Sequence, residues 1–82
     1  MEQLIINMCE ANLVVEKYNE VEFVAYLQDK KTNCITQDIA TIRPVQEGEG
    51  YMPGAVECLV WVDGSNEDYT DRFVINRYLE AA

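Results

Sequence analysis

The clearest pattern of hydrophobic and polar positions lies near the C-terminal end of the chain. Side chains alternate across a β-strand, so residues 56–62 (VECLVWV) would place three valines and a cysteine on one face. The opposite face would carry a leucine and a tryptophan beside one glutamate, which indicates that it is partly covered as well. Residues 63–68 (DGSNED) contain turn formers and no apolar side chain, and residues 73–78 resume the alternation. This pattern predicts an antiparallel hairpin on which the rest of the chain packs.

Residues 4–18 fit two different structures. As a helix, they would place five apolar or aromatic side chains along one stripe. As strands, they divide into LIINM and LVVEKY around a turn at residues 10–12. Pairs of β-branched residues lower helix propensity and Asn12 is a common turn residue, so we expect two strands. A helix over residues 4–18 is the alternative.

The middle of the chain predicts a second hairpin. Residues 21–27 (VEFVAYL) alternate as a strand does, and the polar residues 29–33 predict a turn. Residues 34–43 (CITQDIATIR) would form the return strand, with a bulge where the alternation slips. Pro44 has no N–H to donate, so it would end this strand or mark a sheet edge. Residues 46–54 hold three of the four glycines and predict a mobile connection between the two hairpins.

Together these segments predict a mainly β fold. We expect five or six antiparallel strands joined as hairpins or a meander, with residues 1–82 forming one small domain. If residues 4–18 were helical, the fold would be α+β. Hydrophobic residues make up 49% of the chain, which is enough to build a core and argues against disorder. The last residues, 79–82, are expected to fray.

The chain is strongly acidic. Fifteen acidic and six basic residues, with no histidine, give a formal net charge of -9. The acids are spread over both halves of the chain, so we expect the whole surface to be acidic. Such a surface repels nucleic-acid phosphates and anionic membranes, which argues against direct binding to either. A charged partner would therefore be a basic protein.

The three cysteines are Cys9, Cys34 and Cys58. They are odd in number and far apart, and the chain has no histidine, so they fit neither a disulfide framework nor a zinc site. We expect reduced, mostly buried thiols in a cytoplasmic protein. The first residues lack the regions of a secretory signal, and no apolar run is long enough to span a bilayer.

The densest group of acids occupies the predicted turn and the residues after it. It consists of Asp63, Glu67, Asp68 and Asp71. Carboxylates spaced along a loop are ligands that calcium prefers, but the order of these residues does not follow the EF-hand spacing. We therefore expect no metal here, and we regard the four acids as candidate contacts for a basic partner.

No pattern points to a reaction centre. A nucleophilic thiol needs an activating base or a positive neighbourhood, and this chain has no histidine and few cations. The glycines of residues 48–54 sit beside glutamates that would repel a phosphate. Four aromatic residues could form a platform for a sugar or a peptide: Tyr26, Trp61, Tyr69 and Tyr78. Aromatic residues that alternate in strands more often fill the core or form cross-strand pairs. Since no pattern indicates a reaction centre, we expect a non-enzymatic protein without a cofactor.

Residues 4–44 resemble a group of known proteins. In order, they show LIINMCEANLVVEKY, then VEFVAYLQD, then a reverse turn and an alternating strand. This succession, with the phrase Val-Glu-Lys-Tyr, resembles small, acidic, β-rich proteins of unknown function carried on bacterial mobile elements. The resemblance implies an accessory or interaction role without assigned chemistry, so no functional residue carries over.

Two functions fit these observations. The first is a small interaction module, as a monomer or a homodimer, that uses a strand edge or the acidic loop against a basic protein. The second is a nucleic-acid mimic that inhibits a DNA- or RNA-binding enzyme, as antirestriction and anti-CRISPR proteins do. Mimicry requires acids concentrated on one face, whereas these are spread along the chain, so the sequence favours the first function.

Overall fold

Residues 2–19, 21–61 and 69–81 are described by the computed structural model, and they fold into β-strands without a helix. None of them therefore forms a helix that could cross a membrane. Two three-stranded sheets are present, with strand orders β1-β2-β3 and β4-β5-β6, and every paired neighbour is antiparallel. The six strands in these ranges are β1 (Glu2–Asn7), β2 (Ala11–Lys17), β3 (Phe23–Asp29), β4 (Ile39–Pro44), β5 (Val56–Trp61) and β6 (Asp71–Ile75).

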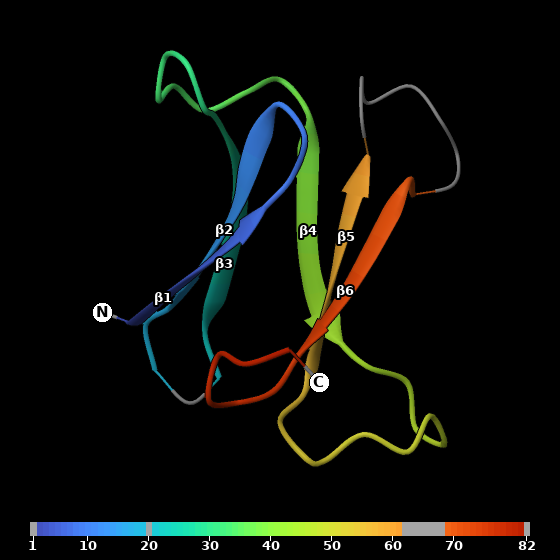
Figure 1. Cartoon of the computed structure of the whole chain (residues 1–82). Coiled ribbons are helices and arrows are strands. Elements are labelled where there is room, and N and C mark those ends of the chain that lie inside the picture. The colour runs from blue at the N-terminus through green and yellow to red at the C-terminus, as the bar shows by residue number, and fades with distance from the viewer. Residues whose placement is uncertain (1, 20, 62–68, 82) are drawn as a thin grey trace.

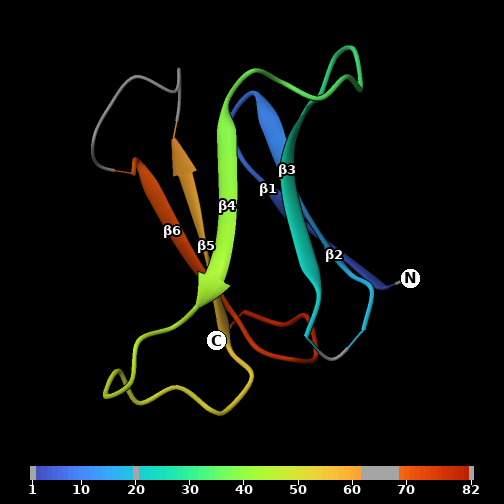
Figure 2. The same cartoon turned by 180° about the vertical axis from the view of Figure 1, so that it is seen from behind.

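The two sheets form two layers that enclose one core. In Figure 1 the sheet of β1 to β3 lies on the left and the sheet of β4 to β6 on the right, and both views place β3 beside β4 (Figures 1 and 2). The buried core side chains come from both layers: Leu13, Val15, Leu27, Val56, Cys58, Val60, Ile75 and Leu79. Inward-facing residues of both sheets thus interdigitate as in other β-sandwiches, and the predicted mainly β fold is confirmed.

The N-terminal segment forms two strands, so the alternative helix over residues 4–18 is wrong. The turn lies at residues 8–10, where the N–H of Met8 donates to the carbonyl of Ala11 at 3.1 Å, and not at residues 10–12 as predicted. In this pair of strands Ile5 lies opposite Val14, and β-branched residues favour such positions in a sheet.

The predicted hairpin of residues 21–43 is wrong, because β3 and β4 belong to different sheets. Residues 34–38 cross from one layer to the other, and β4 begins only at Ile39. In this crossing, Ile35 makes a single isolated bridge to Gln28 and remains 68% exposed. The predicted bulge is absent from the described residues, because no strand pairs with β3 on this side. The alternation of residues 34–43 is irregular because this segment is not one strand: a crossing between the sheets is followed by β4.

The C-terminal hairpin is confirmed in its strands. Val56, Cys58 and Val60 lie in the core, and the opposite face of β5 is covered, with Glu57 and Leu59 only 3% and 2% exposed. The predicted turn at residues 63–68 lies outside the described residues.

Strand β6 is shorter than predicted, because residues 76–80 form a turn. The side-chain oxygen of Asn76 accepts the N–H groups of Tyr78 at 2.8 Å and Glu80 at 3.1 Å. This turn directs Leu79 into the core, where it is 7% exposed, and an isolated bridge joins Ala81 to Ile75. The prediction that residues 79–82 fray is wrong for 79–81, because a buried leucine and backbone pairing hold them.

Candidate binding groove

A hollow in the described part of the molecule opens where β3 and β4 spread apart. It has a volume of about 500 Å³ and is lined by the start of β3, the end of β4 and the loop of residues 45–54. A second hollow of about 310 Å³ adjoins it and shares Val21, Phe23, Pro44 and Val56 with it. We call the two together the corner groove. Its apolar lining includes Val21, Phe23, Ile42, Val45, Met52 and Val56.

Two exposed apolar side chains lie at the mouth of the corner groove. Val21 is 83% exposed and Met52 is 64% exposed. Val21 was predicted to begin a strand, but it lies in a turn in which the side-chain oxygen of Asn19 accepts the N–H groups of Val21 and Glu22 at 2.9 and 3.0 Å. This turn presents Val21 to solvent instead of placing it in the sheet. Exposed apolar groups gathered at a concave site are typical of binding surfaces.

The charged residues of the corner groove are mostly acidic. Glu22 lines the smaller hollow and Glu47 the larger one, and both are exposed. Arg43 also lines the smaller hollow, but its guanidinium is paired with Glu57. A ligand with basic groups beside its apolar groups would therefore meet a complementary rim.

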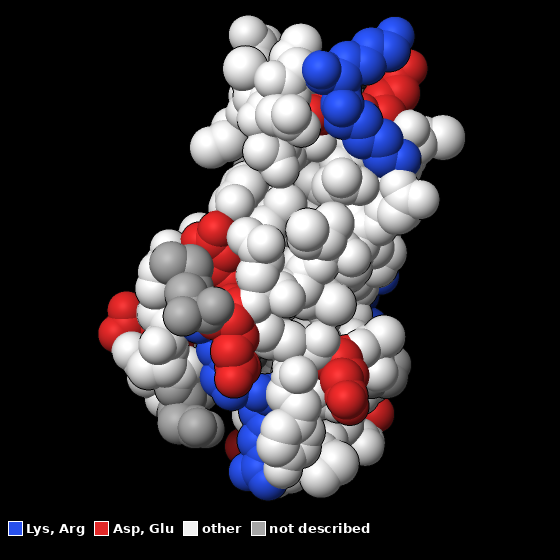
Figure 3. Space-filling view, turned by 60° about the vertical axis from the view of Figure 1, so that its left-hand side comes forward, with Lys and Arg blue, Asp and Glu red and all other residues white. Residues whose placement is uncertain are grey.

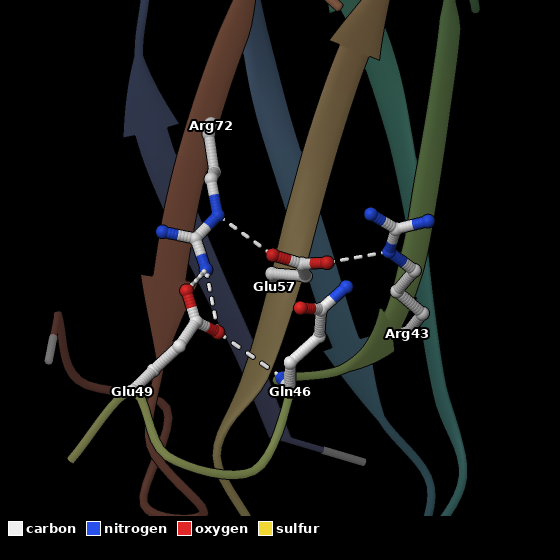
Figure 4. Close-up of polar contacts among 5 residues, drawn as sticks. All are labelled: Arg43, Gln46, Glu49, Glu57 and Arg72. Carbon is white, nitrogen blue, oxygen red and sulfur yellow. Dashed lines mark hydrogen bonds and ion pairs between the residues drawn. The ribbon is translucent and has the colours of Figure 1, made fainter. Parts of the chain in front are cut away.

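The loop of residues 45–54 joins β4 to β5 within the second sheet, so the prediction that it connects two hairpins is wrong. Ion pairs on the outer face of this sheet hold it. Arg43 on β4 and Arg72 on β6 both bind Glu57 on β5, with 2.6 Å between Arg72 Nε and the carboxylate (Figure 4). The other end of Arg72 donates to both carboxylate oxygens of Glu49 in the loop, at 2.9 and 3.1 Å. Glu49 in turn accepts the N–H of Gln46 at 3.1 Å. Four side chains thus tie the loop to three strands.

The loop returns to β5 through a backbone conformation that requires glycine. Gly54 has a φ of 87°, and a Cβ at this position would lie 3.4 Å from the Cβ of Arg77. A larger residue would therefore strain the backbone and crowd the C-terminal turn. This return places Met52 over the groove and starts β5 in register with β4, where Val56 pairs with Pro44.

Among the described residues, three carboxyl groups have displaced pKa values, and all three pKa values are lowered. Hydrogen bonds from Arg43 and Arg72 lower the pKa of Glu57. Hydrogen bonds from Tyr26 and Tyr18 lower the pKa of Glu16, and the backbone N–H groups of Thr32 and Lys31 lower that of Asp29. These three groups are anions at neutral pH, whereas a carboxylic acid that donates a proton in catalysis needs a raised pKa.

The structure describes only one member of the predicted acidic group. Asp63, Glu67 and Asp68 lie outside the described residues, and Asp71 is exposed at the start of β6. Asp71 lines a hollow of about 300 Å³ together with Glu10 and Asp38. Within residues 2–19, 21–61 and 69–81, no three acids or cysteines are arranged to hold a metal ion. A role for the four acids in partner binding remains a prediction.

The predicted thiols and aromatic residues are more dispersed than expected. Cys58 is buried, but Cys9 and Cys34 are exposed, so the expectation of mostly buried thiols is wrong. Trp61 and Tyr69 form an edge-to-face pair with ring centroids 6.2 Å apart. Tyr26 lies on the other sheet, so the four aromatic residues share neither a platform nor a core. The sequence analysis does not single out Val21 or Met52 as candidate binding residues. For Met52 the sequence offers one signal, an exposed apolar residue beside a proline in a glycine-rich loop.

No protein-family model, curated protein or solved structure matches this chain. The resemblance to proteins of bacterial mobile elements therefore remains a prediction.

Proposed function

We propose that this protein is a small, non-enzymatic interaction module that binds an apolar segment of a basic partner protein in the corner groove. The observation that carries the proposal is the position of Val21 and Met52, two exposed apolar side chains at the mouth of an apolar hollow. Burying each of them against a partner would contribute about 1–2 kcal/mol. Together the two contacts would contribute about 2–4 kcal/mol, to which contacts with the rest of the apolar lining would add.

Charge supports a basic partner. The net charge of -9 attracts cations over the whole molecule, and Glu22 and Glu47 continue this charge to the groove itself. Long-range attraction of this kind accelerates association and weakens as salt screens it. The three free thiols suit a reducing compartment, and we propose the cytoplasm.

Capture of proteins from the source cell by the immobilised wild type and three immobilised variants tests this function. The wild type and Ile5→Asp should retain the same basic protein, whereas Val21→Asp and Met52→Asp should lose it, with an affinity lower by about tenfold or more. Ile5 is a matched control because it is 55% exposed and faces outward from the other sheet, opposite Val14. Equal retention by all four proteins would contradict the proposed site.

The alternative of a nucleic-acid mimic gains no support from the arrangement of charge. Glu57 is buried, and Glu16 and Glu49 are engaged by neighbouring side chains. Figure 3 shows the side of the molecule on which β1 to β3 lie, where a broad uncharged area separates the charged side chains at the two ends. A mimic needs a continuous row of anions, which this face lacks. Capture of a nuclease through acidic residues outside the corner groove would revive this alternative.

A further inference from the structure

The corner groove is bordered by a strand edge that lacks a backbone partner along half its length. The far edge of β3 is engaged only near its end, where Leu27 accepts the N–H of Thr36 and the N–H of Asp29 donates to Cys34, both at 2.9 Å. Backbone groups alternate in direction along a strand, so those of Phe23 and Ala25 point the same way, away from β2. None of the backbone hydrogen bonds between described residues engages Phe23 or Ala25 on this side.

The edge of β4 that faces β3 is also unpaired within the described residues, but it is a poorer template. The N–H of Val45 points at β5, so the backbone groups of Ile42 and Pro44 point at β3 by the same alternation. Pro44 has no N–H to offer, which suits an edge position. A strand that enters the corner would therefore find its donors and acceptors on β3.

The free edge begins at the apolar hollow, and Ala25 lies farther along the edge, beyond the lining of the hollow. Phe23 belongs to both parts of the corner groove, and β3 and β4 spread apart toward this end of the molecule (Figures 1 and 2). A strand added to β3 would place every second side chain toward the hollow and the others toward solvent. Unpaired backbone groups next to a pocket for alternate side chains are the two elements of recognition by strand addition.

We propose that the partner segment binds as an extended strand that adds to the free edge of β3 at Phe23 and Ala25. This inference rests on the proposed function and specifies its ligand: a peptide of about six residues with aliphatic side chains at alternate positions and Lys or Arg between or beside them. The aliphatic side chains enter the hollow lined by Ile42, Met52 and Val56. The cations face Glu22 and Glu47.

The occupant is a partner and not a second copy of this chain. Two copies would bring together two molecules that each carry a net charge of -9, and the rims of both grooves are acidic. Repulsion between like charges opposes this association, whereas a basic peptide meets complementary charge.

Peptides selected from a random library displayed on phage provide the test. We expect the wild-type protein to select peptides in which aliphatic residues alternate with other residues and Lys or Arg is enriched. Each amide of a selected peptide is then methylated in turn, and its affinity for the protein is measured by calorimetry. Methylation of every second amide should weaken binding by about tenfold, because it removes a hydrogen bond to β3 and inserts a methyl group into the pairing edge. Methylation of the amides in between should have little effect.

The possible outcomes separate the binding mode from the proposed function. If methylation weakens binding at consecutive positions or at none, while Met52→Asp still weakens it, the groove binds a segment that is not a strand, and only the inference fails. If binding is unaffected by Met52→Asp and Val21→Asp, the groove is not the site and the proposed function fails too. Failure to select any peptide contradicts strand addition, and the capture experiment then decides the proposed function alone. A wild-type dimer that a selected peptide dissociates would make a second copy the occupant.

Discussion

Glu57 is the buried charged residue among those described, and it shows how one side chain links the sheet to the groove. It lies on the outer face of β5, where the carboxylate of a central strand can reach neighbours on both sides. Arg43 and Arg72 supply these neighbours, and Arg72 passes the link on to Glu49 in the loop. A buried carboxylate is tolerated because its lone pairs are satisfied by charged donors.

Glu57→Gln should destabilise the protein by about 1–3 kcal/mol, because it removes a charge that two guanidinium groups face. The expected loss of stability is no larger because the Arg43 side chain is 56% exposed, so water can replace part of the lost interaction. Urea unfolding at pH 7 measures the change, and Glu49→Gln is a control expected to cost less than about 1 kcal/mol, since Glu49 is more exposed. Equal costs for the two variants would contradict the central position of Glu57.

The carboxyl group of Glu57 should also make the stability of the protein depend on pH. The pKa of Glu57 is lowered in the folded protein relative to the usual 4.5. Its stabilisation is therefore complete above the unfolded value and is lost as the pH falls through the lower folded value. Urea unfolding between pH 7 and pH 3, values chosen to lie on either side of that range, should show a steep loss for the wild type and a shallower loss for Glu57→Gln. Parallel curves would show that other carboxyl groups, such as Glu16 and Asp29, carry the acid sensitivity.

The thiols provide a second prediction for single residues. Burial raises the pKa of Cys58 to about 12, whereas Cys9 and Cys34 are exposed. Because the thiolate is the reactive form, a disulfide reagent at pH 8 should modify two thiols of the folded protein quickly and the third only after unfolding in urea. The variant Cys58→Ala should show the two fast reactions and no late one. Fast modification of all three thiols in the folded wild type would contradict the buried position of Cys58.

At the scale of elements, alternation predicts where the strands lie, and it predicts the pairing of β5 with β6 but not the neighbours of β4. The apolar face of residues 56–62 predicts β5 correctly, because this central strand packs that face into the core. The prediction of one strand over residues 34–43 is wrong, because in sequence a crossing followed by a short strand cannot be distinguished from one irregular strand. Sequence alternation does not say in which sheet the next strand lies, because a polar turn can lead either to a hairpin or to the opposite layer.

The candidate groove was harder to predict than the fold. Its residues come from the start of β3, the end of β4 and the loop of residues 45–54, which are brought together only by the packing of the two sheets. The sequence identifies the loop as a glycine-rich connection, but it does not identify Met52 as part of a hollow. Exposed apolar residues become informative only when their neighbours in space are known.

Proline substitutions test the free edge of β3. The N–H of Tyr26 points at β2, opposite Val14, so Tyr26→Pro should cost about 3 kcal/mol or more through a lost ladder bond and a steric clash. The N–H of Ala25 points at the unpaired edge, so Ala25→Pro should cost clearly less. Urea unfolding of the two variants measures both changes. An equal loss of stability would mean that the backbone of Ala25 already has a partner.

At the scale of the whole molecule, the two layers are held together by their core, and β3 and β4 lie side by side where the layers meet. The arrangement leaves an opening at one corner, while the ion pairs around Glu57 hold the loop that forms one wall of that opening. The chain carries a net charge of -9 and the lining of the corner groove is mostly apolar, so in the proposed function different residues attract the partner and anchor it. The proposed binding mode therefore depends on one property of the folded chain, an edge of β3 that is free to pair.

Amide hydrogen exchange of the folded protein, followed residue by residue by NMR, tests this property most directly. Exchange at Val24 and Tyr26, whose N–H groups pair with β2, should be slower by about a hundredfold or more than exchange at Phe23 and Ala25. A peptide bound as a strand should then slow exchange at Phe23 and Ala25 selectively. Equal protection of all four amides in the free protein would contradict the account, because the edge of β3 would already be occupied.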